Sequence, residues 1–395
     1  MDTGIYEHVM DACLRCGGCT SACTSLQRAG LDLHGVAAGM QAGLAAGDGT
    51  PRSAGPALAA TPGLVQAVRG CFFCTECVKH CPAGIDVCSL VYTSRDVFQE
   101  AGLIERGAWS SVLVDEEWHI FSAYRAIYGI GYGDLTRHVV GAGFEGATDC
   151  AAAFFPGCSL AAYGPQLTRE VFSYLEGVLG KCTLIDECCG SPLHSAGFPD
   201  RAAALEARIV SQIVASGARS VVFTCPGCAN IVGRALREAG ADIEVTTVAR
   251  VMREHGRAPV QTPERLRVFK SCQDRDGSYL ADTLALFSDA CIGGTIESGC
   301  CGAGGAVSAF CPEQQQEKVQ GIMDACPSGE TLVTMCPTCT YTQAYRQYTT
   351  GDARITCKNY LELLFAADFD WNTVFAQLTG MWSGEYGPWL SQVFA

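Results

Sequence analysis

Twenty-five cysteines in 395 residues dominate the chemistry that this sequence can support. Eight of them form two runs with the same 2-2-3 spacing, Cys13, Cys16, Cys19 and Cys23, then Cys71, Cys74, Cys77 and Cys81. Such a run wraps three irons of a [4Fe–4S] cube, and its fourth cysteine reaches a second cluster. The spacing predicts one cube on Cys13, Cys16, Cys19 and Cys81, and another on Cys71, Cys74, Cys77 and Cys23. Zinc or unligated thiols are the alternative, although zinc sites usually pair two C-x2-C knuckles across a longer gap.

The region from residue 151 to about residue 365 contains an internal repeat. Each copy holds a lone cysteine after an apolar run, then a Cys-Cys-Gly motif, then a Cys-x2-Cys motif. The lone cysteines, Cys158 and Cys272, are 114 residues apart, and the two motifs recur at offsets of 112 and 111 residues. Short apolar runs alternate with helices expected over 165–179, 200–216 and 313–325, which predicts parallel βα units. Since ligands gather at the carboxyl ends of parallel strands, we expect ten cysteines at that edge of two sheets.

The composition narrows the class of protein. A formal net charge of −14 and only five lysines argue against a nucleic-acid binder. No apolar run is long enough for a spanning helix, and the first residues lack the basic and apolar regions of a signal peptide. Because cytosolic thiols stay reduced, this many cysteines without an export signal favour metal ligation over disulfides. We therefore expect a cytoplasmic protein.

The fold class expected is α/β, with a helical N-terminal domain ahead of two duplicated domains. Residues 1–103 are expected to form a ferredoxin-like domain with helices around residues 36–44 and over 84–103, and a loop around 47–51. A connector over 104–150 leads to duplicated domains at 151–258 and 259–365, followed by a tail at 366–395. Connector and tail are rich in aromatic residues, which either dock a partner or pack in the core: Trp109, Trp118, Phe121, Tyr124, Tyr128, Tyr132, Trp371, Trp382 and Trp389.

The cysteine motifs resemble those of the heterodisulfide reductase family. The two 2-2-3 runs, the second continuing as Cys-Pro-Ala-Gly-Ile-Asp-Val from Cys81, resemble its C-type iron–sulfur subunit. The duplicated module resembles the B-type subunit of the same enzyme, and the order of the two parts resembles the fused D-type subunit. The C-type subunit of anaerobic glycerol-3-phosphate dehydrogenase is more distantly similar. The resemblance covers residues 10 to about 365, and Thr24 stands where a proline commonly follows the last cysteine of a run.

The resemblance implies a noncubane [4Fe–4S] centre in each module, two fused iron–sulfur units that share a bridging thiolate, in addition to the two cubanes. Five thiolates exceed what a cube requires, and adjacent cysteines crowd a single tetrahedron, although ordinary cubes remain the alternative. Carried over by motif, the first centre takes Cys158, Cys188, Cys189, Cys225 and Cys228. The second takes Cys272, Cys300, Cys301, Cys336 and Cys339.

The function that the resemblance implies is that of an oxidoreductase acting on sulfur groups within an anaerobic multi-subunit complex. Electrons taken through the two cubanes would reach the noncubane centres and reduce a disulfide to two thiols. The alternatives are a non-catalytic relay between a dehydrogenase and a membrane quinone or other carrier, and an interaction scaffold with structural clusters. An open cleft between the two Cys-Cys-Gly loops favours catalysis, and a closed apolar contact there favours the relay.

The partners expected follow from what the sequence lacks. It has no dinucleotide fingerprint and no P-loop, so electrons must come from another protein. That partner is expected to be a flavin-containing or membrane cytochrome redox subunit, which would place this chain at the inner face of the membrane. The other partner is a disulfide or thiol, either a small molecule or a protein.

Two residues outside the cysteine sets are candidate catalytic groups. His194, five residues after Cys189, is suited to donate a proton to a departing thiolate, or else it packs near the cluster for shape. Lys270 precedes Cys272 and either offsets the charge of a cluster or substrate, or is a solvated lysine at a strand end. Lys270 and Gln273 stand where the family often has histidine. The seven other cysteines are expected to be small buried hydrophobic residues: Cys88, Cys150, Cys182, Cys291, Cys311, Cys326 and Cys357.

Overall fold

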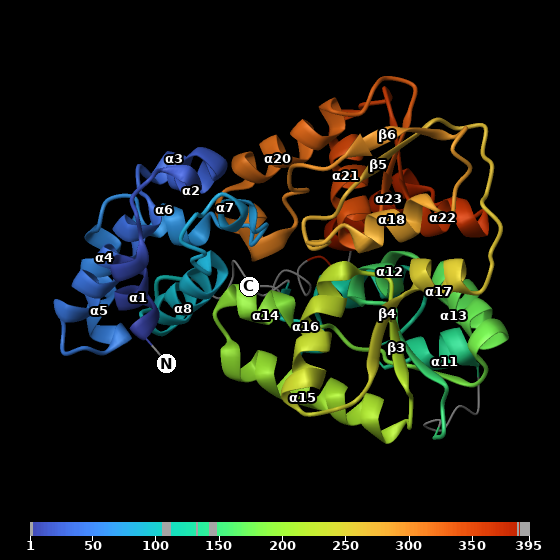
Figure 1. Cartoon of the computed structure of the whole chain (residues 1–395), viewed down its shortest axis with the longest axis horizontal. Helices are drawn as coiled ribbons and strands as arrows, with labels where there is room; N and C mark the ends of the chain where they lie inside the picture. The colour runs from blue at the N-terminus through green and yellow to red at the C-terminus, as the bar shows by residue number, and fades with distance from the viewer. Residues whose placement is uncertain (1–2, 105–111, 132, 142–147, 385–386, 388–395) are drawn as a thin grey trace.

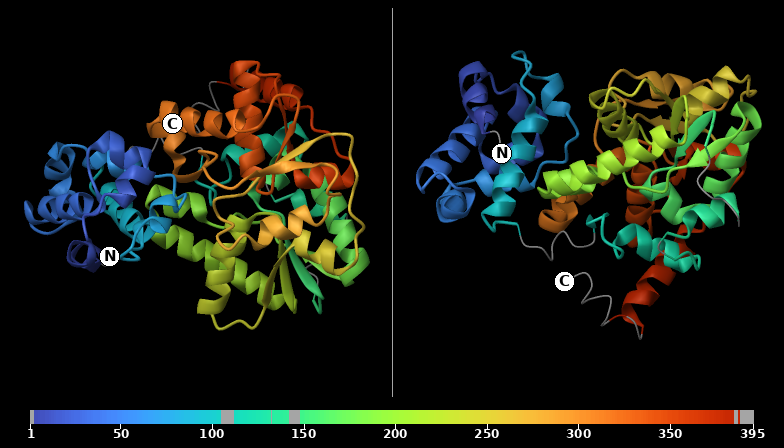
Figure 2. Two further views of the ribbon diagram at one scale, coloured as in Figure 1. Left: turned by 45° about the horizontal axis from the view of Figure 1, so that its top comes forward. Right: turned by 90° about the horizontal axis from the view of Figure 1, so that it is seen from below.

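The computed structural model describes residues 3–104, 112–131, 133–141, 148–384 and 387. A helical N-terminal unit lies beside two α/β units, as Figure 1 and the turned views of Figure 2 show. Its helices are α1 (Gly4–Ala12), α2 (Gly18–Ala22), α3 (Thr24–Ala29), α4 (Leu33–Ala45), α5 (Pro51–Ala60), α6 (Leu64–Arg69), α7 (Glu76–Lys79) and α8 (Val87–Glu100). None of the helices within the described ranges is long and apolar enough to cross a membrane.

The N-terminal unit agrees with the sequence prediction except at α5. Helices α4 and α8 lie where they were expected, and each begins at an aspartate whose side chain accepts a hydrogen bond from the first turn. The loop expected around residues 47–51 is present, and α5 follows it over residues for which the sequence predicted no helix. Thr50 accepts from the amide of Ser53, and Pro51 stands at the first helical position, where its missing N–H costs nothing. Burial of Leu58 against Gly43 of α4 then stabilises α5, although the helix contains Gly55 and Pro56, two residues that disfavour helix.

The two α/β units have the same sheet, which confirms the predicted duplication and fold class. The first sheet has the parallel order β2-β1-β3-β4 and the second the order β6-β5-β7-β8. The strands are β1 (Ala152–Phe155), β2 (Cys182–Leu184), β3 (Ser220–Phe223), β4 (Glu244–Thr247), β5 (Leu266–Phe269), β6 (Ile292–Ile296), β7 (Thr331–Thr334) and β8 (Thr356–Asn359). Strands β1 and β5 are central and fully or nearly fully buried, as expected for parallel sheets covered on both faces.

Helices follow the strands in both units, and the three that the sequence predicted lie within a residue of their expected bounds. The first unit has α12 (Cys158–Tyr163), α13 (Pro165–Leu179), α14 (Ser191–Ala196), α15 (Pro199–Ala215), α16 (Pro226–Glu238) and α17 (Val248–Glu254). The second has α18 (Ser278–Leu284), the 3-10 turn η2 (Gly304–Ala306), α19 (Val307–Phe310), α20 (Pro312–Asp324), α21 (Pro337–Thr350) and α22 (Tyr360–Phe365). Connector and tail add α10 (Ile120–Ile127), α11 (Leu135–Val140) and α23 (Trp371–Ser383).

One hydrophobic core joins the two α/β units. Helices α12, α13 and α17 of the first unit pack against α21, α22 and α18 of the second. Within this core the hydroxyl of Tyr279 donates to the carbonyl of Thr224 at 2.8 Å and lies 3.1 Å from the hydroxyl of Tyr360. The two sheets are therefore fixed relative to one another.

The described residues of the connector and tail contribute side chains to this core. The Tyr124 hydroxyl bonds that of Tyr341 at 3.0 Å, and the Trp371 ring stacks on Phe375. Core packing, the alternative to partner docking, thus holds for Tyr124 and Trp371. Trp109, Tyr132 and Trp389 lie outside the described residues, as does the side chain of Trp382.

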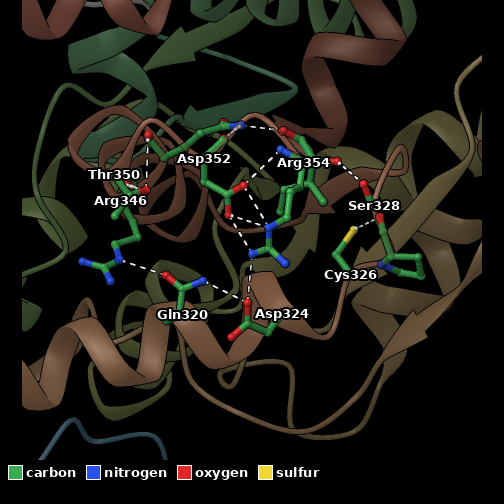
Figure 3. A network of polar contacts seen from close by, with 11 residues as sticks. Gln320, Asp324, Cys326, Ser328, Arg346, Thr350, Asp352 and Arg354 are labelled. Atoms are coloured by element: carbon green, nitrogen blue, oxygen red, sulfur yellow. Dashed lines mark hydrogen bonds and ion pairs between the residues drawn. The ribbon is translucent and has the colours of Figure 1, made fainter.

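A polar network on the outer side of the second unit joins α20 to α21 and the turn that follows it (Figure 3). Arg354 pairs with Asp324 at 2.9 Å and with Asp352 at 2.7 Å, and Arg346 donates to Gln320 at 3.1 Å. Because the side chains of Arg354 and Asp324 are about half-exposed, at 49% and 56%, their pair adds little stability. The position of α20 depends more on its apolar side, which is buried in the second unit.

The inner end of α20 and the turn η2 dock the second unit onto the N-terminal unit. Gln314 is fully buried and donates to the carbonyl of Gly70 at 3.2 Å. Gly305 lies against the backbone of Cys71 so closely that a Cβ there would stand 2.1 Å from the Cys71 carbonyl oxygen. This close approach of two backbones requires glycine, and its positive φ of 70° requires it again.

The Gly305→Ala substitution is therefore expected to lower the free energy of unfolding by about 2 kcal/mol or more, since it adds left-handed backbone strain to overpacking. Gly321→Ala, at an open position within α20, is the matched control and is expected to be neutral or slightly stabilising. Urea unfolding of both variants measures the difference. Equal stability of the two variants would contradict the docking described here.

Candidate iron–sulfur sites

The first predicted cubane set converges on one pocket. Cys13, Cys16, Cys19 and Cys81 all line a pocket of about 330 Å³, counted with its opening to solvent. The pocket is formed by the α1–α2 loop, the start of α2 and the segment after α7. Four thiols around one hollow are the donor set that a [4Fe–4S] cube requires. The second run thus supplies its fourth cysteine to the first run, as the spacing predicted.

The second predicted cubane set is also brought together, deeper in the protein. Burial raises the pKa of Cys77, and the neighbouring Cys71, Cys23 and Cys74 raise it further. Burial likewise raises the pKa of Cys71 to about 12, while the charge of Arg95 opposes the shift. Thiols that raise each other's pKa are close enough for their negative charges to repel, and bound iron compensates such charges.

In the first α/β unit, the five predicted ligands lie at the carboxyl edge of the sheet. Cys158 begins α12 after β1, and Cys225 is the N-cap of α16 after β3, with proline at the first helical position. The thiol of Cys188 donates to that of Cys158 across 3.6 Å. Cys189 lies beside Cys188 and Cys228, which both act on its pKa.

The second unit repeats the arrangement with its own five cysteines. Cys336 is the N-cap of α21, again followed by proline. The Cys339 thiol donates to Cys301 at 3.1 Å, and Cys300 lies beside Cys301 and Cys272, which both raise its pKa. All five members of each set are therefore in contact within their own unit.

The glycine of each Cys-Cys-Gly motif has a conformation that other residues rarely adopt. Gly190 has φ of 85° and Gly302 has φ of 73°. This left-handed turn reverses the chain directly after the paired cysteines and starts the next helical segment. The motif therefore holds two adjacent, buried cysteines at a tight turn.

The thiol sets are linked to each other and to the N-terminal unit. The Cys225 and Cys336 sulfur atoms, one from each α/β unit, are 3.6 Å apart. At the other side of the second unit, Cys74 of the second cubane set packs against the small apolar cluster that contains Cys300. We call this series of contacts the thiol path: Cys74, Cys300, Cys301, Cys339, Cys336, Cys225, Cys228, Cys189, Cys188 and Cys158.

The donor chemistry of these sets suits polynuclear clusters. Neighbouring thiols and burial together raise the pKa of Cys188 and of Cys228. Across the described ranges, no three or more His, Cys, Asp or Glu side chains converge on a position for a single metal ion. An iron–sulfur cluster distributes its ligands over several irons, so its thiols need not point at one centre.

The two candidate catalytic residues have different surroundings. His194 Nε2 is 2.7 Å from Glu206 Oε1, and the same carboxylate pairs with Arg234 at 3.1 Å. Glu206 also lies within electrostatic reach of Cys189. Lys270 follows β5, and its charge opposes the effect of burial, which raises the pKa of Asp274. The structure thus brings His194 near the first thiol set through Glu206, and Lys270 near Asp274.

Five of the seven remaining cysteines are buried, as predicted: Cys150, Cys182, Cys291, Cys326 and Cys357. The prediction was wrong for the other two, which are only partly buried. Cys88 lies beside Cys71 and Cys74, and burial raises its pKa to about 12. The Cys311 thiol donates to Gln66 at 3.5 Å, at the contact between the N-terminal and second units. Sequence reasoning also missed Arg95, because its role depends on segments far apart in the chain.

Comparison with known proteins agrees with this geometry. The model of the cysteine-rich domain matches residues 152–233 and again residues 267–342. The model of the 4Fe-4S dicluster domain matches residues 9–85. No curated protein matches the chain. The chain therefore combines one dicluster domain with two cysteine-rich domains, iron–sulfur electron-transfer domains of the kind found in heterodisulfide reductase-like subunits.

If the eighteen candidate cysteines hold four clusters of four irons each, anaerobically purified protein should contain about sixteen irons per chain. Cys16→Ser is expected to lower the content by up to about four irons, because serine is a poor ligand for iron in such a cluster. The buried Cys150→Ala is the control and should retain the full content. Colorimetric iron and sulfide analysis measures both. Zinc in place of iron, or about eight irons in the unmodified protein, would contradict the assignment.

Proposed function

We propose that this protein is the iron–sulfur redox subunit of a heterodisulfide reductase-like complex. In this proposal two [4Fe–4S] cubanes and two noncubane [4Fe–4S] centres supply one-electron transfers, which together reduce a disulfide to two thiols. The reaction takes up two electrons and two protons, breaks the S–S bond and releases two thiols. A flavin-containing or membrane cytochrome subunit is the proposed source of the electrons.

The observation that carries the proposal is the thiol path. Electron transfer between clusters requires closely spaced redox sites. The path runs from the dicluster domain through the second cysteine-rich domain to the first. Along the path, the second cysteine-rich domain comes directly after Cys74, and the first cysteine-rich domain comes after the second. Both domains also retain all five cysteines, which supports two working centres.

The residues around the path have distinct roles in the proposal. Ser159, next to Cys158 in the first unit, bonds Thr338 of the second Cys-x2-Cys turn at 2.7 Å and so joins the two units at their cysteine sets. The His194–Glu206 pair is the proposed proton donor for a departing thiolate at the first unit. Lys270 is proposed to offset negative charge near Cys272.

A second candidate function is favoured by one contact. Helix α14 and the turn η2, which follow the two Cys-Cys-Gly motifs, pack against each other. These segments are thus in contact, and closure at this place is a feature of the relay, although the buried Arg95 guanidinium makes the contact polar rather than apolar. A relay would pass electrons from a dehydrogenase to a membrane quinone or another carrier without breaking a disulfide.

The substitutions Cys189→Ser and Cys301→Ser distinguish these functions. Each is expected to abolish reduction of a small asymmetric disulfide by reduced viologen dye, because breaking one S–S bond needs a site for both sulfurs. The buried Cys182→Ala, outside the thiol path, is the control and should keep its rate. Activity is followed by dye oxidation and by thiol release.

Near-normal disulfide reduction by both serine variants would rule out the catalytic role given to these cysteines. Reduction of an artificial electron acceptor by the unmodified protein, with no reduction of any disulfide tested, would establish the relay instead.

A further inference from the structure

The deepest charged side chain in the N-terminal unit is Arg95, on α8. It has no exposed surface, and its guanidinium donates five hydrogen bonds to backbone carbonyl oxygens. Three of them go to the segment that enters the second cysteine run, at Val68 (3.0 Å), Arg69 (2.8 Å) and Cys71 (2.9 Å). The guanidinium also lies over the Phe73 ring, 4.9 Å from its centroid. Arg95 therefore lies against the loop that carries the second cubane set.

The other two hydrogen bonds reach the two α/β units. One Nη1 atom donates to the carbonyl of Ser195 in α14 at 2.6 Å and to that of Gly305 in η2 at 2.7 Å. These segments directly follow the two Cys-Cys-Gly motifs. A single guanidinium thus connects the dicluster domain to the corresponding place in both cysteine-rich domains.

Carbonyl oxygens satisfy the donors of a guanidinium but do not cancel its charge. An arginine stays protonated in proteins, and a charge in a low-dielectric interior acts over several ångströms. The positive charge of Arg95 acts on the Cys71 thiol in this way. By contrast, Arg15 lines the first pocket but is exposed, so water and salt screen it.

We propose that Arg95 sets the reduction potential of the iron–sulfur centre held by Cys23, Cys71, Cys74 and Cys77. A fixed positive charge favours the reduced centre, which carries one more negative charge, and therefore raises its potential above that of the centre in the first pocket. The higher potential directs electrons toward Cys300 and the thiol path. The inference rests on the proposed cluster at these four cysteines and not on the identity of the final acceptor.

The test is an anaerobic redox titration of the full chain monitored by EPR spectroscopy. Arg95→Met is expected to lower the reduction potential of one dicluster centre by at least 59 mV, which is a tenfold shift of its one-electron equilibrium toward the oxidised form. Arg95→Lys keeps the charge with fewer hydrogen bonds, so the potential should stay close to that of the unmodified protein while thermal stability falls. Arg15→Met, the exposed control, should leave both potentials in place.

An unchanged potential in folded Arg95→Met would overturn the proposal. Equal lowering by the methionine and lysine variants would also overturn it, because that result assigns the shift to altered packing. If the Arg95 variants do not fold, the unmodified protein and two ligand variants still decide. Cys16→Ser should remove the dicluster signal of lower potential and Cys77→Ser that of higher potential, and the reverse assignment refutes the proposal. None of these measurements depends on disulfide reduction. A failure of the proposed function can therefore be distinguished from a failure of this inference.

Discussion

The buried guanidinium of Arg95 holds three parts of the chain at one point, and the geometry of the thiol path depends on that junction. Its hydrogen bonds to Cys71, Ser195 and Gly305 join the dicluster loop to the segments after both Cys-Cys-Gly motifs. The close approach of Gly305 to the Cys71 backbone is part of the same junction. A small apolar cluster of Phe72, Cys300 and Val307, with Cys74 packed against it, lies at the same contact between the units.

Duplication explains the rest of the path. Two identical parallel sheets each deliver a lone cysteine, a cysteine pair and a Cys-x2-Cys turn to one edge. A shared core orients the sheets so that Cys225 and Cys336 meet at equivalent helix N-termini. The repeat is nevertheless asymmetric, since only the second copy contacts the dicluster ligands through its cysteine pair.

Much of this arrangement could be predicted from the sequence, because the signals are local. The 2-2-3 spacing predicted the exchange of Cys23 and Cys81 between runs, and the alternation of short strands with helices predicted both sheets. Helix α5 was missed because Gly55 and Pro56 resemble a loop, and the helix depends on packing against α4. Arg95, Cys88 and Cys311 were missed for a related reason. Their neighbours lie in distant segments, and nothing in the adjacent residues distinguishes a buried arginine at a junction from an ordinary one on a helix surface.

In the proposed function, electrons enter the cysteine-rich domains through the Cys74–Cys300 contact and reach the first domain only through the second. Internal duplication supplies a matched pair of variants, Cys300→Ser and Cys188→Ser, at equivalent positions of the two Cys-Cys-Gly motifs. The measurement is freeze-quench EPR and Mössbauer spectroscopy after mixing with a reduced ferredoxin as a protein-sized donor. We predict that Cys300→Ser leaves the centre of the first domain oxidised, whereas Cys188→Ser still allows reduction of the second. Rapid reduction of the first centre in Cys300→Ser protein would contradict this order of electron transfer.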